Sequence, residues 1–102
     1  MKRPLILHVL AGLRAGGAER VLQSVAVHST HEFQHRIVSL SDLGTIGHEL
    51  VDAGLDVHSL DLQSVSQIPS AMKRLAALAG DADIVHGWLY YGAIAAFFLR
   101  TL

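Results

Sequence analysis

The sequence predicts an α/β fold built around a parallel sheet, and three observations lead to this prediction. Residues 5–10 (LILHVL) form a near-continuous apolar run, as in a strand that is covered on both faces. Segments with the spacing of amphipathic helices then alternate with further short apolar segments. Finally, 51% of the 102 residues are hydrophobic and 17% are charged, which is enough apolar material for the core of one small domain.

Four segments are predicted to be strands. The first is Leu5–Leu10, and Arg36–Leu40 (RIVSL) is the second, followed by a turn of Ser, Asp and Gly. Leu55–Leu60 alternates apolar and polar residues, which is typical of a strand near a sheet edge. Asp83–His86 (DIVH) is predicted to be a short, buried fourth strand.

Helices are predicted between and after these strands. The second helix ends at Gly54, and the third has Pro69 in its first turn and ends at Gly80. A fourth helix is predicted over Tyr91–Leu102. The apolar faces of the first three helices are Ala18, Val21, Leu22, Val25 and Ala26; Ile46, Leu50 and Val51; and Met72, Leu75, Ala76, Leu78 and Ala79.

This order of elements requires parallel crossovers, which are almost always right-handed. We therefore expect a Rossmann-like sheet in which the strands lie in the order third, second, first, fourth. The last predicted helix reaches residue 102 without a Gly cap, a Pro or a polar tail. Residues 1–102 are therefore interpreted as one domain that is incomplete at its C-terminal end.

Charge and composition exclude several classes of protein. The net charge is -1 and the eight Lys and Arg residues are scattered, so we expect no nucleic-acid partner. The absence of Cys excludes disulfides and thiolate metal sites, and it fits a cytoplasmic protein. The N-terminal residues resemble a signal peptide, but His8 and Arg14 interrupt the pattern. The longest uncharged stretch, Val85–Leu99, is too short for a transmembrane helix.

Two consecutive glycines, Gly16 and Gly17, stand between the first strand and the first helix. Glycines there allow the backbone to approach a ligand, and the start of the helix offers N–H groups and a positive dipole end to a diphosphate. The spacing is not the GxGxxG of dinucleotide-binding folds, so a tight turn explains these residues equally well. Arg14 lies in the same loop and is a candidate contact for an anion, whereas Glu19 suits the first turn of a helix.

Further candidates follow the fourth strand. In open parallel sheets, ligands collect at the carboxyl ends of the strands, where His86, Trp88 and Tyr90 are expected. These side chains suit contacts with a sugar or burial beneath further chain. The seven histidines fall mostly on separate elements without an HxxxH pair, so no metal site is assigned. For His8 and His58, which lie within strands, a structural hydrogen bond is expected.

Four segments together carry a resemblance to a known family. They are LILHVL, Gly16–Leu22 (GGAERVL), Ser39–Gly44 (SLSDLG) and Asp83–Tyr90 (DIVHGWLY). In this order they resemble the N-terminal domain of the GT-B glycosyltransferases of family four, bacterial enzymes that build polysaccharide and lipopolysaccharide. GGAERVL after a first strand is the most specific of the four, and the resemblance covers essentially the whole chain.

The resemblance implies an enzyme that transfers a sugar from a nucleotide-diphosphate donor with retention of configuration and without a cofactor or required metal. The N-terminal domain would supply the surface for a polysaccharide, lipid-linked or lipopolysaccharide acceptor. Its loop at Gly16 and Gly17 would contact the donor diphosphate. Such an enzyme is expected in the cytoplasm, with peripheral association at the inner face of the membrane.

The chain also departs from this family by omission. It lacks the later strands of the domain, the histidine that often follows the next strand, and the paired-glutamate motif of the second domain. No catalytic residue is therefore assigned, and the chain alone is expected to be inactive. An unpaired fourth strand beside an apolar last helix predicts self-association as a homo-oligomer. The apolar residues of that helix are Ile94, Phe97, Phe98 and Leu102.

Two other functions fit the same predicted sheet. In a nucleotide-binding oxidoreductase, Asp42 would bind the ribose, although the glycine spacing argues against this function. A flavodoxin-like binding module would place a phosphoacceptor near Asp61. It would also need acidic residues where Ala11 and Gly12 stand.

Overall fold

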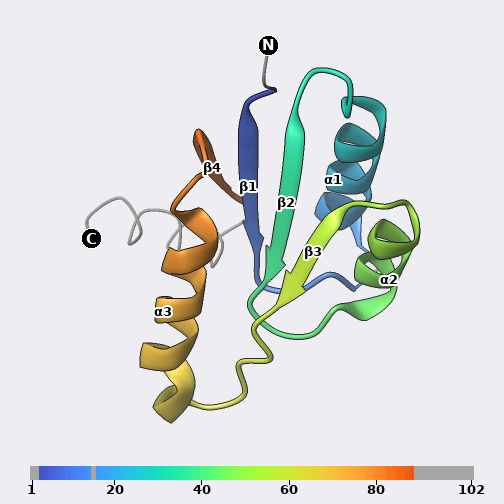
Figure 1. The fold of residues 1–102 in the computed structure, drawn as a ribbon. Helices are drawn as coiled ribbons and strands as arrows, with labels where there is room; N and C mark the ends of the chain where they lie inside the picture. The colour runs from blue at the N-terminus through green and yellow to red at the C-terminus, as the bar shows by residue number, and fades with distance from the viewer. Residues whose placement is uncertain (1–2, 15, 89–102) are drawn as a thin grey trace.

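The computed structural model describes residues 3–14 and 16–88, and it confirms the α/β fold (Figure 1). Four parallel strands form one sheet in the predicted order, β3-β2-β1-β4, which is a Rossmann-like arrangement. The elements are β1 (Leu5–Leu10), α1 (Gly17–His28), β2 (Gln34–Ser39), α2 (Gly44–Asp52), β3 (Asp56–Ser59), the 3-10 turn η1 (Val65–Gln67), α3 (Ile68–Ala79) and β4 (Ile84–Gly87). The helix predicted over Tyr91–Leu102 lies outside the described residues. Within the described ranges, no helix is both long and apolar enough to span a membrane.

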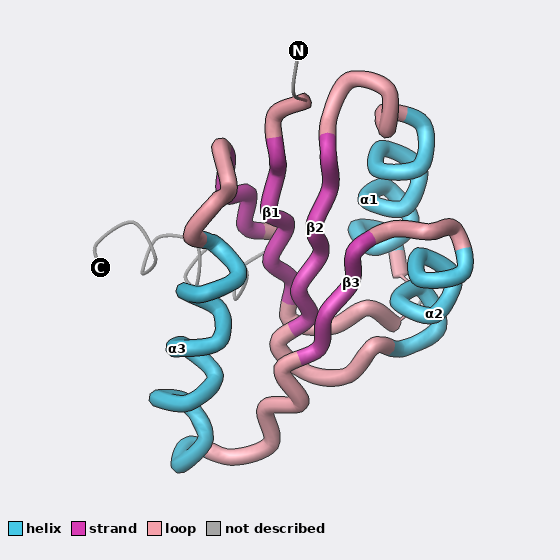
Figure 2. Tube along the Cα trace, in the orientation of Figure 1, coloured by secondary structure: helices cyan, strands magenta, loops and turns pink. Residues whose placement is uncertain are grey.

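Helices cover both faces of the sheet, with α1 and α2 on one face and α3 on the other (Figure 2). Alternate residues of β1 supply the two cores, because successive side chains of a strand point to opposite faces. Leu7 and Val9 pack with Leu75 of α3, whereas Leu10 packs with Leu22 of α1. The sheet is therefore covered on both faces, as the continuous apolar sequence of β1 predicts.

β2 begins two residues earlier than the sequence predicts. Gln34 pairs with Leu5 in the sheet, and its N–H donates to the carbonyl oxygen of Pro4 at 2.8 Å. The apolar pattern begins only at Ile37, so hydropathy does not reveal that the polar residues before it already pair with β1. The extension brings His35 into the sheet, where it is buried.

The prediction that the fourth strand is buried is wrong for the described residues. Ile84 is 44% exposed and His86 is also exposed. β4 is an edge strand of the described sheet and pairs only with β1. Val85 alone packs against the core beside α3.

The apolar face of α1 is wider in the sequence than in the structure. Leu22 and Ala26 are fully buried, but Val21 and Val25 are 54% and 46% exposed. The helix buries one narrow line of side chains against the sheet and α2, so the flanking valines face outward. Val51 of α2 is likewise exposed.

The predicted helix ends are confirmed at Gly54 and Gly80. Gly54 has φ +87 and donates to the oxygen of Val51 at 2.9 Å, while the next residue donates to the oxygen of Leu50 at 3.1 Å. These two bonds form a Schellman motif, which satisfies carbonyl groups at the end of α2. Gly80 is the C-cap of α3, and Pro69 lies in the first turn of that helix.

Arg36 of β2 joins three elements at the amino edge of the sheet. It forms ion pairs with Asp56 at 2.8 Å and with Asp81 at 2.7 Å, and it donates to the carbonyl oxygen of Leu78 at 2.7 Å. Burial alone would raise the pKa of Asp56, but hydrogen bonds from Arg36 and His58 outweigh burial and hold that pKa below its ordinary value. The Arg36 side chain is 19% exposed, whereas the side chains of Asp56 and Asp81 are 49% and 67% exposed, so solvent screens both ion pairs in part.

Candidate functional site

The N-terminus of α1 is open and carries no side-chain cap. Gly16, the N-cap, has an extended backbone with φ -167 and ψ 178, and it makes no capping side-chain bond. Its carbonyl oxygen accepts the first helical bond, from the N–H of Arg20 at 3.0 Å. The N–H groups of the first three helical residues therefore have no partner within the helix. A Cβ on Gly17 would meet nothing within 4 Å, so open space adjoins this turn.

A pocket of about 320 Å³ lies beside this helix end, at the carboxyl ends of the strands. We call it the α1 pocket. It is lined by Leu10, Ala11, Gly12, Arg14, Glu19, Ser41 and Trp88. The carboxyl edge of a parallel sheet is where open α/β folds bind ligands. Of the residues at the start of α1, Glu19 lines the pocket, whereas Gly16 and Gly17 precede it in the chain and are not among the lining residues.

The carboxylate of Glu19 is folded back over the start of α1. Its Oε2 atom lies 2.6 Å from the position that a Cβ on Gly16 would take. A negative group there complements the helix dipole, which agrees with the role that the sequence suggests for Glu19.

Arg14 and Asp42, both candidates from the sequence, lie together. Their side chains form an ion pair of 3.7 Å and are 83% and 53% exposed, so the pair adds little to stability. Arg14 also lines a second pocket of about 180 Å³, together with Ser41, Asp42 and Asp61. The Arg14 side chain thus borders two adjoining pockets, and the carboxylate proposed for a dinucleotide ribose is already paired with it.

His86 and Trp88 also lie together, with their ring centroids 4.7 Å apart. Trp88 is half-buried, and its backbone N–H donates to the oxygen of Val9 at 2.9 Å, which fixes the chain just beyond β4. Only Trp88 of the two rings lines the described α1 pocket. Tyr90 lies outside the described residues.

A buried histidine pair behind Trp88 was not predicted from the sequence. His8 of β1 and His35 of β2 are 2% and 5% exposed, and their Nε2 and Nδ1 atoms are 2.9 Å apart. Burial, and then the neighbouring His35 and His86, lower the pKa of His8 from 6.5 to about 3. The pKa of His35 is lowered too, first by burial and then by Arg3. Both rings are therefore neutral at physiological pH.

Strand order and register are the signal that could have revealed this cluster. His8 lies directly opposite His86 of β4. On β2, His35 lies opposite Ile6, two residues before His8, so the two histidine side chains are on the same face of the sheet. The expectation of a structural hydrogen bond is confirmed for His8 and for His58, which bonds to Asp56 at 2.7 Å. Across residues 3–14 and 16–88, no group of three or more His, Cys, Asp or Glu side chains could hold a metal ion.

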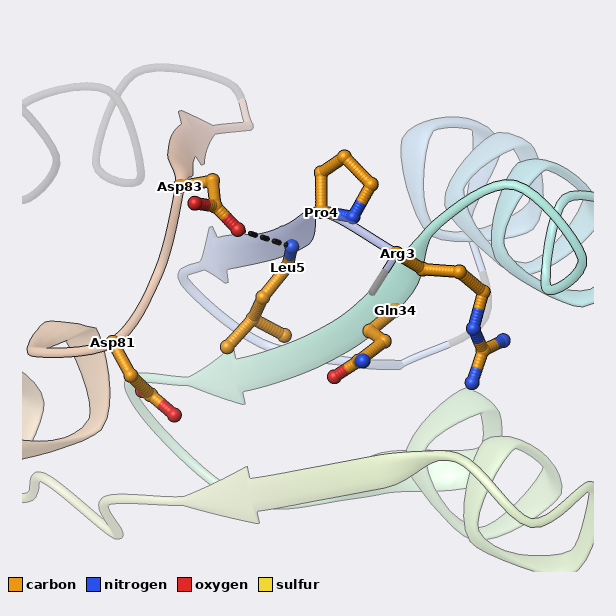
Figure 3. Close-up of a pocket in the computed structure, with 6 residues that line it drawn as sticks. All are labelled: Arg3, Pro4, Leu5, Gln34, Asp81 and Asp83. Carbon is orange, nitrogen blue, oxygen red and sulfur yellow. Dashed lines mark hydrogen bonds between the residues drawn. The ribbon is translucent and has the colours of Figure 1, made fainter. Parts of the chain in front are cut away.

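A larger cavity of about 360 Å³ lies at the opposite, amino edge of the sheet (Figure 3). It is lined by Arg3, Pro4, Leu5, Gln34, Asp81 and Asp83. The Asp83 carboxylate accepts the backbone N–H of Leu5 at 2.7 Å, and Asp81 is paired with Arg36. These carboxylates tie strands together, and helix N-termini do not point to this edge in parallel α/β folds. We therefore take the α1 pocket as the candidate site.

Comparison of the chain with models of protein families, with curated proteins and with solved structures finds no match.

Proposed function

We propose that this chain is the acceptor-side domain of a retaining glycosyltransferase that uses a nucleotide-diphosphate sugar. The observation that carries the proposal is the open N-terminus of α1 at Gly16 and Gly17, beside the α1 pocket. Its N–H groups and dipole favour a diphosphate. The GGAERVL resemblance supports the same ligand from the sequence.

Each candidate residue takes a role in this proposal. The backbone at Gly16 and Gly17 contacts the diphosphate, and Arg14 provides a positive charge beside it. Asp42 orients Arg14 through their ion pair, and His86 and Trp88 present aromatic surface to a glycan or lipid-linked acceptor. Tyr90 is proposed as a further acceptor contact, and no metal is required.

The remaining proposals concern the whole enzyme. A second domain would bind the nucleotide and supply the catalytic groups, so the chain alone would be inactive. The enzyme would act in the cytoplasm, in peripheral contact with the inner face of the membrane. Self-association of the chain would involve the edge of β4 that pairs with no strand among residues 3–14 and 16–88, because unpaired strand edges can pair with another chain.

Gly17→Val tests the proposed diphosphate contact in the full-length protein that contains this chain. A Cβ on Gly17 would enter open space beside the first turn of α1, and the methyl groups of a valine would extend into that space and hold a diphosphate away. We expect turnover of the nucleotide-sugar to fall by about tenfold, which corresponds to about 1.4 kcal/mol. Steady-state kinetics with a panel of nucleotide-sugars would measure this effect.

Gly80→Ala is the control, because Gly80 is the C-cap of α3 and lies outside the α1 pocket. A Cβ at this position would make only an ordinary contact, 3.6 Å from the carbonyl oxygen of Ala77. Both variants should keep the free energy of unfolding within about 1 kcal/mol of the parent. Unchanged turnover in Gly17→Val would mean that the glycines form only a turn.

A further inference from the structure

The only tryptophan of the chain forms a wall of the α1 pocket and is held from behind by a buried imidazole. The Nε1–H group of Trp88 donates to Nδ1 of His8 at 3.0 Å. His8 itself is 2% exposed and lies in the centre of the sheet, on β1. The orientation of the indole is therefore linked to an atom of the rigid core.

The direction of each hydrogen bond in this cluster follows from the chemistry of the groups. An indole N–H can only donate, so Nδ1 of His8 carries no proton. Neutral His8 then has its proton on Nε2 and donates to Nδ1 of His35, 2.9 Å away. His35 in turn carries its proton on Nε2. The network thus assigns the same tautomer to both rings.

The far end of the network is anchored on α1. Nε2–H of His35 donates to Oγ of Ser29 at 2.7 Å, and the Ser29 hydroxyl donates to the carbonyl oxygen of Val25 at 2.6 Å. His8, His35 and Ser29 each use one donor and one acceptor, whereas Trp88 only donates and the carbonyl of Val25 only accepts. Among the described residues, no buried side-chain nitrogen or oxygen lacks a partner. A fully satisfied polar network of this kind favours one arrangement of its members.

We propose that His8 is a positioning residue, which fixes the Trp88 indole as the wall of the α1 pocket through this directed network. The titratable and charged groups around the network are His86 of β4, whose ring centroid is 5.9 Å from that of His8, His35 of β2, and Arg3 near His35. A His8 that served only to fill the core would not need a particular tautomer. It would also not control the exchange of the indole proton.

The consequence for ligand binding rests on the proposed function. A fixed indole offers a flat apolar face to a ligand, and binding then costs no conformational entropy for ordering that side chain. A loosened indole would lose this advantage. The probe for this consequence is UDP, a nucleoside diphosphate.

The first test uses nuclear magnetic resonance on the unmodified chain. We expect the ring ¹⁵N shifts of His8 and His35 to report protonated Nε2 and unprotonated Nδ1 at neutral pH. The single indole N–H signal should exchange slowly with water and show a scalar coupling to Nδ1 of His8. A proton on Nδ1 of His8, or a freely exchanging indole, would overturn the positioning role.

The second test compares three variants. His8→Leu removes the acceptor, and we expect indole exchange to accelerate by at least about tenfold, in line with the loss of one hydrogen bond. His8→Asn places an amide oxygen near the Nδ1 position without a titratable group, so the slow exchange should return. His86→Gln is the control, because the ring of His86 lies tilted beside Trp88, with ring centroids 4.7 Å apart, whereas the indole nitrogen bonds to His8. If His8→Asn does not rescue the slow exchange, the role of His8 is only structural.

Titration with UDP separates the two ideas. We expect His8→Leu to weaken UDP binding about three- to tenfold, and His8→Asn to bind within about twofold of the parent. If UDP binds the parent and His8→Leu equally well, the indole does not shape the pocket for this ligand and that part of the inference is wrong. If the parent chain shows no UDP binding, the proposed diphosphate contact at the start of α1 is contradicted, while the exchange data still decide the positioning role.

Discussion

Gly44→Ala is expected to lower the free energy of unfolding by about 3 kcal/mol, because two costs add at this position. Gly44 has φ +60, a left-handed conformation that an alanine adopts at a cost of about 1–2 kcal/mol. A Cβ there would also lie 2.7 Å from the carbonyl carbon and oxygen of Leu13 and 2.8 Å from the nitrogen of Arg14. These contacts are with backbone, so rotating a side chain cannot relieve them. Urea denaturation followed by circular dichroism would measure the loss.

Gly54→Ala is the matched control for this prediction. Gly54 has φ +87, but a Cβ at this position would meet nothing within 4 Å. Its substitution should cost only the conformational term, about 1 kcal/mol. Equal losses in the two variants would show that the contact between the loop after β1 and the start of α2 is not tight. The close packing of Gly44 against the backbone of Leu13 and Arg14 positions the loop that carries Arg14, which lines the α1 pocket.

Acid is expected to destabilise the protein well above the pH at which carboxylates titrate. The pKa of His8 is about 3 in the folded protein and 6.5 ordinarily, so the unfolded chain binds the extra proton first. The stabilisation is complete above pH 6.5 and is lost as the pH falls toward 3. For His8 alone, the free energy of unfolding is expected to fall by about 2 kcal/mol at pH 5 and by about 3 kcal/mol at pH 4, relative to its value at pH 8. His35, whose pKa is also lowered, acts in the same direction.

Urea unfolding between pH 8 and pH 4, with circular dichroism as the readout, would measure this loss. In His8→Leu, which has no group to protonate at that position, the loss over the same range should shrink by more than half. The pKa of Asp56 is also lowered, but the stability that this gives is lost only as the pH falls below the ordinary value of 3.8. An unchanged pH dependence in His8→Leu would contradict the assignment of a neutral, buried His8.

The sequence predicts the strand order and β1 correctly because these depend on local pattern and on the handedness of parallel crossovers. The end of α2 is predictable for the same reason, since Gly54 marks a left-handed cap. The exposure of β4 was not predictable, because the apolar residues Ile84 and Val85 do not reveal which elements, if any, cover the strand. Val21 and Val25 of α1 show the same limit, as apolar spacing gives the face of a helix but not its buried width.

Some features of the candidate site can be predicted from the sequence, and others depend on the fold. The glycines at the start of α1 are visible in the sequence, because their place after a strand already suggests a ligand-facing turn. The pairing of Arg14 with Asp42 and of His86 with Trp88 depends on which loops meet at the carboxyl edge. The contact between His8 and His35 depends on strand register, which hydropathy does not specify.

Titration of the ¹⁵N-labelled chain with UDP, followed by amide chemical shifts, tests the central claim most directly. The account predicts weak, saturable binding whose largest shifts fall on the amides of Gly17, Ala18 and Glu19 at the start of α1. Inorganic pyrophosphate should compete with UDP, because the diphosphate is the group that the helix end recognises. No shift at millimolar UDP, or shifts confined to Gln34 and Asp83 at the amino edge, would contradict the account.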